Sequence, residues 1–285
     1  MVVAMKRILT LVAAICAIAS AASAQEKLVI LHTNDTHSHI DPDRGGKNEG
    51  QAGIIERAAY IDSVRQAVGA KNVLVVDAGD YDQGSSYHDV FKGDFEPKVL
   101  NAIGMDVVTL GNHEFDEGPY DLARRLKTFK FDVVLCNYDI DIPELASQLK
   151  PYTIVRKAGL KIGVIGVLTD VTTVVNGDYA ALLKYKDPVE PVNRYAELLK
   201  KKHCDLVIVL SHLGYENSGD DEGNISDIDL AGQSRNVDVI VGGHSHTFID
   251  VASEVENLDG RKVIVVTDGK FGYEIGKLEI PVSRK

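Results

Sequence analysis

The chain has 285 residues, of which 45% are hydrophobic and 26% charged, an ordinary globular composition that excludes a disordered, collagen-like or coiled-coil protein. It carries 42 Asp and Glu against 31 Lys and Arg, which gives a formal net charge of −11. This surplus of carboxylates argues against a nucleic-acid duplex or an anionic membrane surface as the main partner. Three cysteines are too few for a disulfide scaffold.

The N-terminus has the layout of a secretory signal peptide. A basic stretch at Met5–Arg7 precedes the uncharged apolar run Ile8–Ser20, and Ala22–Ala24 supplies a small-x-small cleavage motif. The apolar run is shorter than the ~20 residues that a membrane-spanning helix needs. We therefore expect a signal peptide over residues 1–24, cleavage near Ala24, and an exported protein that is periplasmic or secreted. We also expect no membrane span and a single catalytic domain over residues 25–285.

Apolar runs rich in β-branched residues alternate with helical patterns along the mature chain, which predicts an α/β domain. Most of these runs end at a polar or glycine-rich cluster, as strands covered on both faces do. Cys136 and Cys204 lie in or beside such runs, so we expect free, buried thiols. The expected strands are Leu28–His32, Val73–Val76, Asp106–Leu110, Asp132–Leu135, Lys161–Leu168, Asp205–Leu210 and Val237–Val241.

Apolar residues spaced three to four positions apart predict helices over residues 54–64 and 189–199. The second helix is expected to begin with Asp187 as its N-cap and Pro188 at the first helical position.

Two segments of the last third show other patterns. Residues 217–224 (NSGDDEGN) predict a solvated acidic loop inside the domain. Arg261–Asp268 and Tyr273–Val282 flank a turn that contains glycine, and this pattern predicts a β-hairpin.

Five strand ends carry Asp, Asn or His side chains in a row along the chain. In open α/β sheets, ligands bind at the carboxyl ends of the strands, where loops hold side chains on a rigid base. So many polar groups would cost stability without partners, and divalent cations are the natural partners. Three or four of the His, the two Asp and the Asn make up a set of up to seven candidate ligands, drawn from Asp35, His37, Asp80, Asn112, His113, His212, His244 and His246.

The types of donor narrow the choice of metal. Imidazole favours Zn, Fe, Mn or Ni, whereas carboxylate and amide oxygens suit Mn or Mg. Seven ligands are too many for one tetrahedral zinc ion, but they fit two ions that share a bridging carboxylate. Two ions ~3.5–4 Å apart clamp the attacking and leaving oxygens of a phosphoryl displacement. We expect two divalent ions, with Mn or Zn favoured and Fe, Co or Mg also compatible.

Two pairs of candidate ligands, Asp35 with His37 and His244 with His246, are separated by one residue. We expect extended backbone at both pairs, since it aims alternate side chains to one side. Glycines beside Asp80, Asn112 and His244 allow tight turns and close backbone approach.

These residues resemble the five motifs of the calcineurin-like metallophosphoesterases. The segments that carry the resemblance are Asn34-Asp35-x-His37, Gly79-Asp80-x-x-x-Gly84, Gly111-Asn112-His113-Glu114, Ser211-His212 and Gly243-His244-x-His246. The fuller forms NDTHSHI, GNHEFD and GGHSHT are similar to the N-terminal catalytic domain of the 5′-nucleotidase branch. The resemblance implies a four-layer α/β/β/α sandwich with a dimetal site at one edge.

The resemblance also implies a role for each residue. One ion would bind Asp35, His37, Asp80 and His246, and the other would bind Asp80, Asn112, His212 and His244. His113 would face the phosphate without binding metal, and Asp116 would orient it. A hydroxide held by the two ions would attack phosphorus. His113 would either stabilise the transition state or protonate the leaving oxygen.

The other polar residues near these motifs are expected to be structural. His32, His39, His88 and His203 are interpreted as solvent-facing or satisfied polar residues, with His88 the best placed of them to touch substrate. Asp77 is interpreted as a turn-former or a support for a ligand.

The sequence thus predicts an exported enzyme that hydrolyses phosphate monoesters in the manner of a 5′-nucleotidase, with a small substrate such as a nucleotide. Full-length 5′-nucleotidases carry a C-terminal domain with a base-stacking aromatic pair, and we expect this chain, which stops at Lys285, to lack it. Base specificity is therefore not carried over. The alternative is a metal-binding accessory module that needs a partner chain to hold substrate. The presence of His113 and Asp116 favours the enzyme.

Overall fold

The computed structural model describes residues 26–173, 175–216 and 224–282. The expected signal peptide at residues 1–24 and nearly all of the expected acidic loop at residues 217–224 lie outside these ranges. Among the described residues, no helix is both long enough and apolar enough to cross a membrane.

The first of two six-stranded sheets has the strand order β14-β1-β2-β3-β4-β6. Five strands of this sheet run parallel, namely β1, β2, β3, β4 and β6. Strand β14 joins the edge of the sheet antiparallel to β1. The bounds are β1 Lys27–Thr33, β2 Val73–Asp77, β3 Val107–Val108, β4 Asp132–Val134, β6 Leu149–Lys150 and β14 Gly276–Pro281.

The second sheet has the order β12-β13-β11-β10-β8-β7, with parallel strands in the centre and an antiparallel strand at each edge. Its bounds are β7 Tyr152–Lys157, β8 Leu160–Leu168, β10 Leu206–His212, β11 Val239–Val241, β12 Ser253–Glu256 and β13 Lys262–Val266. A separate pair joins β5 (Tyr138–Ile140) to β9 (Leu183–Tyr185).

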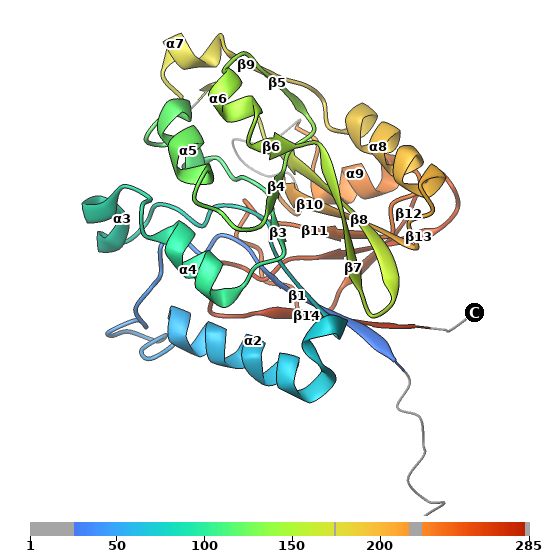
Figure 1. Ribbon diagram of the computed structural model, residues 1–285, viewed down its shortest axis with the longest axis horizontal. Helices are drawn as coiled ribbons and strands as arrows, with labels where there is room; N and C mark the ends of the chain where they lie inside the picture. Colours follow the sequence, from blue (N-terminus) through green and yellow to red (C-terminus); the bar gives the residue numbers. More distant parts are fainter. Residues whose placement is uncertain (1–25, 174, 217–223, 283–285) are drawn as a thin grey trace, which may run out of the picture.

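Helices cover the outer face of each sheet, and Figure 1 shows α2 and α8 on opposite sides of the two sheets. The longer helices are α2 Ile54–Val68, α4 Glu96–Ile103, α5 Pro119–Leu126, α8 Val189–Lys201 and α9 Asp227–Gln233. The shorter ones are α3 Ser86–Phe91, α6 Pro143–Ala146 and α7 Gly177–Ala180, with 3₁₀ turns at Ala70–Asn72, His113–Phe115 and Val171–Thr173.

Strand β1 shows why the sheets are buried on both faces. Its side chains alternate, so Val29 and Leu31 join the apolar cluster under α2, α4 and α5, while Leu28 and Ile30 pack between the two sheets. A third cluster packs α8 and α9 against the outer face of the second sheet. These three clusters separate four layers, which confirms the α/β/β/α sandwich predicted from the resemblance. Cys136 and Cys204 are free and buried, as predicted.

Two local predictions were wrong. Helix α8 has Pro188 as its N-cap, one residue later than expected, although the Asp187 carboxylate still accepts the N–H of Val189 at 2.9 Å. The predicted C-terminal hairpin does not form, because β13 pairs with β11 and β12 whereas β14 pairs with β1 in the other sheet. The connection between them crosses from one sheet to the other, and the Phe271 N–H within it donates to the Asp35 carbonyl at 2.7 Å.

Candidate metal centre

The candidate ligands come together at the carboxyl ends of parallel strands in both sheets. Asp35 and His37 follow β1, Asp80 follows β2, and Asn112 follows β3 in the first sheet. In the second sheet, His212 is the last residue of β10, and His244 and His246 follow β11. Since the two sheets pack face to face, residues from both reach one edge of the sandwich.

The first group consists of Asp35, His37 and His246, whose ligand atoms all lie within 4.8 Å of one another. His37 Nε2 lies 2.9 Å from His246 Nε2, and Asp35 Oδ1 lies 3.4 Å from His246 Nε2. Two ring nitrogens this close must either share a proton or direct their lone pairs at a common cation. The adjacent carboxylate favours a cation there.

The second group consists of Asp80, His212 and His244, again within 4.8 Å. His212 Nδ1 lies 2.8 Å from the Ala78 carbonyl, which can only accept, so this nitrogen carries the proton. Its buried Nε2 faces Asp80 Oδ2 at 3.2 Å, and in the neutral ring this nitrogen carries the lone pair that can bind a metal. Burial lowers the pKa of His212, but the Asp80 carboxylate outweighs it and raises the value to about 10, so a metal ion that binds Nε2 must displace a proton. The same pairing holds the pKa of Asp80 well below its usual range despite burial.

Asp80 lies between the two groups. Its Oδ2 is 3.2 Å from His212 Nε2 and 3.9 Å from His37 Nε2, while its Oδ1 accepts the His113 N–H at 2.9 Å. One carboxylate oxygen therefore faces both groups, which is the arrangement that a shared ligand requires. Asn112 Oδ1 is buried without a hydrogen-bond partner, so this acceptor also fits a cation.

The backbone at these positions differs from the predicted extended conformation. Five of the seven candidate ligands have left-handed φ angles, namely Asp35 at 48°, His37 at 46°, Asp80 at 55°, His244 at 76° and His246 at 54°. Residues other than glycine rarely adopt this left-handed backbone conformation, and such backbone strain is concentrated at functional sites. Hydrogen bonds hold the conformation, since Asp35 N–H donates to the Gly79 carbonyl and His37 N–H to the Asp80 carbonyl.

The predicted close approach at glycines is confirmed between the loops after β2 and β3. A Cβ on Gly79, whose φ is +93°, would lie 2.4 Å from the Gly111 nitrogen. A Cβ on Gly111 would lie 2.1 Å from Asp80 Oδ1. Only glycine at both positions lets Asp80 sit against the loop that carries Asn112.

Two acidic residues hold the loop after β2. Asp77 accepts the Gly79 N–H at 2.9 Å and the Thr33 hydroxyl at 2.6 Å, as expected of a turn-former, and burial raises the pKa of Asp77 to about 7. Glu114, to which we assigned no role from sequence, accepts the N–H groups of Asp80 and Gly111. Burial, with a contribution from Asp80, raises the pKa of Glu114 to about 7.

A buried ion pair connects the loop after β2 to helix α5. Arg125 pairs with Asp82, and it also donates to Asp121 at 2.8 Å and to the Glu114 carbonyl at 2.8 Å. The side chains of Arg125 and Asp82 are 1% and 0% exposed. These contacts tie α5 to the two loops that carry Asp80 and Asn112.

We expect Arg125→Leu to lower the free energy of unfolding by ~3–5 kcal/mol, because it leaves the Asp82 carboxylate buried without its charge partner. The neighbouring Arg124 is the matched control, since its side chain is 54% exposed and pairs with Asp94 and Asp121 at the surface. Arg124→Leu should cost no more than ~1 kcal/mol. Urea unfolding of the two variants measures both values, and equal losses would contradict a specific role for the buried pair.

His113 and Asp116 form a hydrogen-bonded pair next to the first group. His113 Nδ1 lies 2.9 Å from Asp116 Oδ2, and about one third of each side chain is exposed. The hydrogen bond to Asp116 raises the pKa of His113, and burial acts in the opposite direction. The ring centroids of His113 and His37 are 5.4 Å apart, so a partly exposed imidazole lies beside the candidate ligands.

The remaining histidines occupy structural positions in the described part of the chain. His32 is buried with Nδ1 2.6 Å from Asp268 Oδ2, and His88 is buried with Nδ1 accepting the Gln83 N–H at 3.2 Å. His39 stacks on Phe271 with ring centroids 4.0 Å apart, and His203 is exposed. None of them belongs to either group of candidate ligands.

Two adjacent groups of His and Asp side chains at one edge of a four-layer sandwich suggest a dinuclear divalent metal centre, as in the class of dinuclear metallohydrolases. A family model narrows this class: the calcineurin-like phosphoesterase model matches residues 28–248. The chain belongs to the calcineurin-like phosphoesterase family.

Relatives and solved structures agree with this assignment. A snake venom 5′-nucleotidase of Gloydius brevicauda is 33% identical over 93% of this chain and 47% of its own length. The human 5′-nucleotidase is 31% identical over 97% of this chain and 50% of its own length. The chain therefore spans about half the length of these relatives. The crystal structure of a 5′-nucleotidase precursor from Thermus thermophilus is 34% identical with a TM-score of 0.79, covering 89% of this chain and 51% of that one. The family, the relatives and the two ligand groups together support a metal-dependent phosphoester hydrolase.

Proposed function

We propose that this protein is an exported dinuclear phosphoesterase that hydrolyses phosphate monoesters, nucleotides among them. The observation that carries the proposal is the position of Asp80 Oδ2, which faces His212 Nε2 at 3.2 Å and His37 Nε2 at 3.9 Å. Export rests on the signal-like N-terminus, and a nucleotide substrate rests on the relatives, two of which are 5′-nucleotidases.

The ligand sets follow the two groups of side chains. We assign the first ion to Asp35, His37, Asp80 and His246, and the second to Asp80, Asn112, His212 and His244. The donors are imidazole, carboxylate and amide without thiolate, which suits Mn and Zn, while Fe, Co and Mg remain compatible. His212 Nε2, which faces Asp80 Oδ2 at 3.2 Å, and the buried Asn112 Oδ1, which has no hydrogen-bond partner, fit this assignment.

When bound, two divalent ions supply a nucleophilic water at neutral pH and neutralise charge on the phosphoryl oxygens. The chain's own residues position the reaction. Asp80 fixes the spacing of the two halves of the site, and the His113 N–H holds its second oxygen. The His113 imidazole, oriented by Asp116 at 2.9 Å, keeps a proton or a positive charge beside the departing oxygen.

Metal removal and reconstitution test the proposal directly. We expect chelator-treated protein to lose hydrolysis of nucleoside 5′-monophosphates and aryl phosphates, and reconstitution with Mn, Zn, Co or Mg to restore it with at least one of these ions. Metal content measured in parallel should reach two equivalents at full activity. Metal binding without hydrolysis of any phosphate ester would instead favour an accessory module that needs a partner chain.

A further inference from the structure

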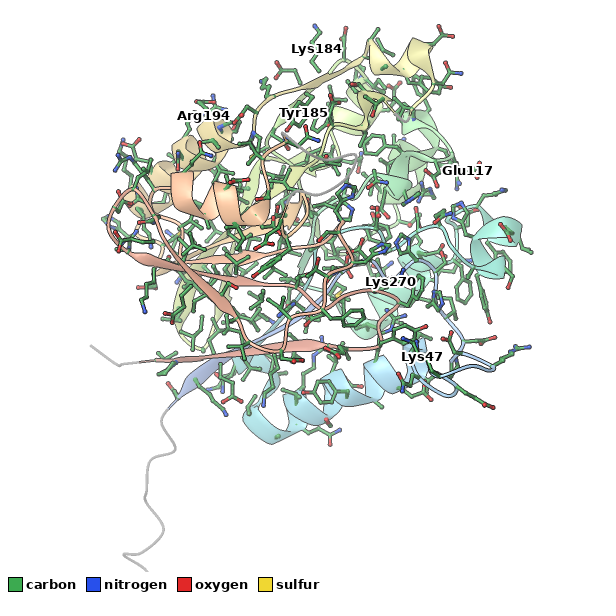
Figure 2. All side chains as sticks on the ribbon, turned by 180° about the vertical axis from the view of Figure 1, so that it is seen from behind. Lys47, Glu117, Lys184, Tyr185, Arg194 and Lys270 are labelled. Carbon is green, nitrogen blue, oxygen red and sulfur yellow. The ribbon has the colours of Figure 1, made fainter. Side chains whose placement is uncertain are left out.

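A cavity of about 300 Å³ lies beside the candidate metal centre, at the lower end of the size range of small-molecule pockets. Two segments far apart in the sequence form it, the turn after β3 and the start of α7. Its lining residues are Asn112, Phe115, Asp116, Glu117, Gly118, Val175, Asn176 and Tyr179. Figure 2 shows Glu117 and Lys270 on the same side of the molecule, and the ring of Phe271, the residue after Lys270, lies 5.8 Å from the ring of His37 in the first ligand group.

Two residues that line the cavity also belong to the proposed reaction site. Asn112 belongs to the second ligand set, and Asp116 holds His113 Nδ1 at 2.9 Å. A group that fills the cavity is therefore next to the imidazole that faces the departing oxygen. The phosphoryl group must lie at the metal ligands, so the part of the substrate on the cavity side is the leaving group.

The lining has the chemistry of a site for hydroxyl groups. Asp116 and Glu117 offer carboxylate acceptors, Asn176 offers an amide, and Tyr179 offers an aromatic face, while none of the described residues that line the cavity is Lys or Arg. Glu117 forms an ion pair with Lys92, which does not line the cavity, and Lys92 Nζ lies 3.3 Å from the Glu117 carboxylate. Hydroxyl donors pair with these acceptors, whereas a leaving group with its own phosphates would meet two carboxylates.

Tyr179 is held in place as one wall of the cavity. Gly118 has a φ of +86°, and a Cβ there would lie only 3.2 Å from Tyr179 Cε2, so the tyrosine ring packs directly on the Gly118 backbone. The Tyr120 ring meets Tyr179 edge to face with centroids 6.0 Å apart. A flat, fixed ring beside carboxylate acceptors suits the C–H face of a sugar.

We propose that this cavity is a leaving-group subsite that selects neutral, hydroxyl-rich alcohols such as a nucleoside or a sugar over leaving groups that carry phosphate. The proposal rests on the proposed function, because it requires ester hydrolysis at the adjacent centre. It assigns the selection of the leaving group to Tyr179, Asn176 and Glu117 of this chain.

The experiment compares metal-loaded wild type with Tyr179→Ala and Glu117→Gln on uridine 5′-monophosphate, ethyl phosphate and pyrophosphate. Tyr179→Ala should lower kcat/KM for uridine 5′-monophosphate by ~10–200-fold and change the value for ethyl phosphate by less than about threefold, since ethanol is too small to reach the ring. Glu117→Gln should also lower kcat/KM for the nucleotide, and it should raise kcat/KM for pyrophosphate relative to the nucleotide. Tyr60→Ala, at a half-exposed tyrosine on α2, is the control and should leave all three values unchanged.

Binding of free uridine to the metal-loaded protein gives a readout that does not depend on turnover. Calorimetry should detect uridine with wild type and the Tyr60→Ala control and a Kd at least ~10-fold higher with Tyr179→Ala. Equal losses of Tyr179→Ala on the nucleotide and on ethyl phosphate, or unchanged uridine binding, would overturn the subsite and leave the hydrolase intact. Failure of wild type to hydrolyse any of the esters would instead refute the proposed function.

Discussion

Asp80→Ala should empty both metal positions at once and lower kcat/KM by ~10³-fold or more. The Asp80 Oδ2 atom faces His37 Nε2 and His212 Nε2 from a single point, so its loss removes one ligand from each ion. Two divalent cations a few ångströms apart also repel each other strongly once the shared negative charge is gone. Each bound ion contributes several kcal/mol to the stabilisation of a phosphoryl transition state, and this is the source of the expected loss of rate.

Metal analysis of the dialysed variant measures this result, and circular dichroism checks that the fold is kept. Asp80→Asn serves as a second variant of nearly the same volume, and it should also lose both ions because the charge is absent. Asp139→Ala is the control, since Asp139 is an exposed aspartate that pairs with Lys186 in the small β5–β9 sheet. Two tightly bound equivalents in Asp80→Ala would show that Asp80 is not the bridge.

The strands and the edge of the site could be predicted because their signals are local. Long apolar runs such as Lys161–Leu168 are buried on both faces, and this requirement leaves a continuous pattern in the sequence. The polar residues directly after each run then fall at one edge of the sheets by topology alone. For this reason the two groups of candidate ligands could be assembled from five short motifs.

The misplaced strand shows where local reasoning ends. Segments 262–266 and 276–281 both have strand character, and a turn containing glycine between them favours a hairpin. The actual partner of β14 is β1, which lies at the other end of the described chain. That pairing depends on the two sheets stacking face to face, and no local pattern encodes it.

The conformation of the ligand loops could not be predicted for a similar reason. Spacing by two residues favours extended backbone, whereas Asp35 and His37 have left-handed φ angles. Backbone contacts from the loop after β2, at Gly79 and Asp80, hold them in that state. The role of Glu114 was also missed, because its partners are backbone N–H groups of another loop, and these leave no trace in the spacing of residues.

His113→Ala should lower kcat by ~10²–10⁴-fold while the metal content stays near that of wild type. The His113 side chain contacts Asp116 and lies outside both groups of candidate ligands, so removing its imidazole takes no ligand from either ion. Its backbone N–H, which holds Asp80 Oδ1, is kept in the alanine variant. Parallel measurement of metal content and kcat separates this effect from the collapse expected for Asp80→Ala.

The dependence on the leaving group then decides what the imidazole does. Nitrophenolate departs readily without a proton, whereas the alkoxide of a nucleoside does not, so a proton donor matters far more for the nucleotide. If His113 donates the proton, His113→Ala should lose much more activity on uridine 5′-monophosphate than on nitrophenyl phosphate, and Asp116→Asn should show the same direction with a smaller loss. Equal losses on the two esters would mean that the imidazolium stabilises charge on the phosphoryl oxygens, because that charge develops with either leaving group. The 2.9 Å hydrogen bond between His113 Nδ1 and the Asp116 carboxylate raises the pKa of His113 and serves both mechanisms, so only the dependence on the leaving group can distinguish them.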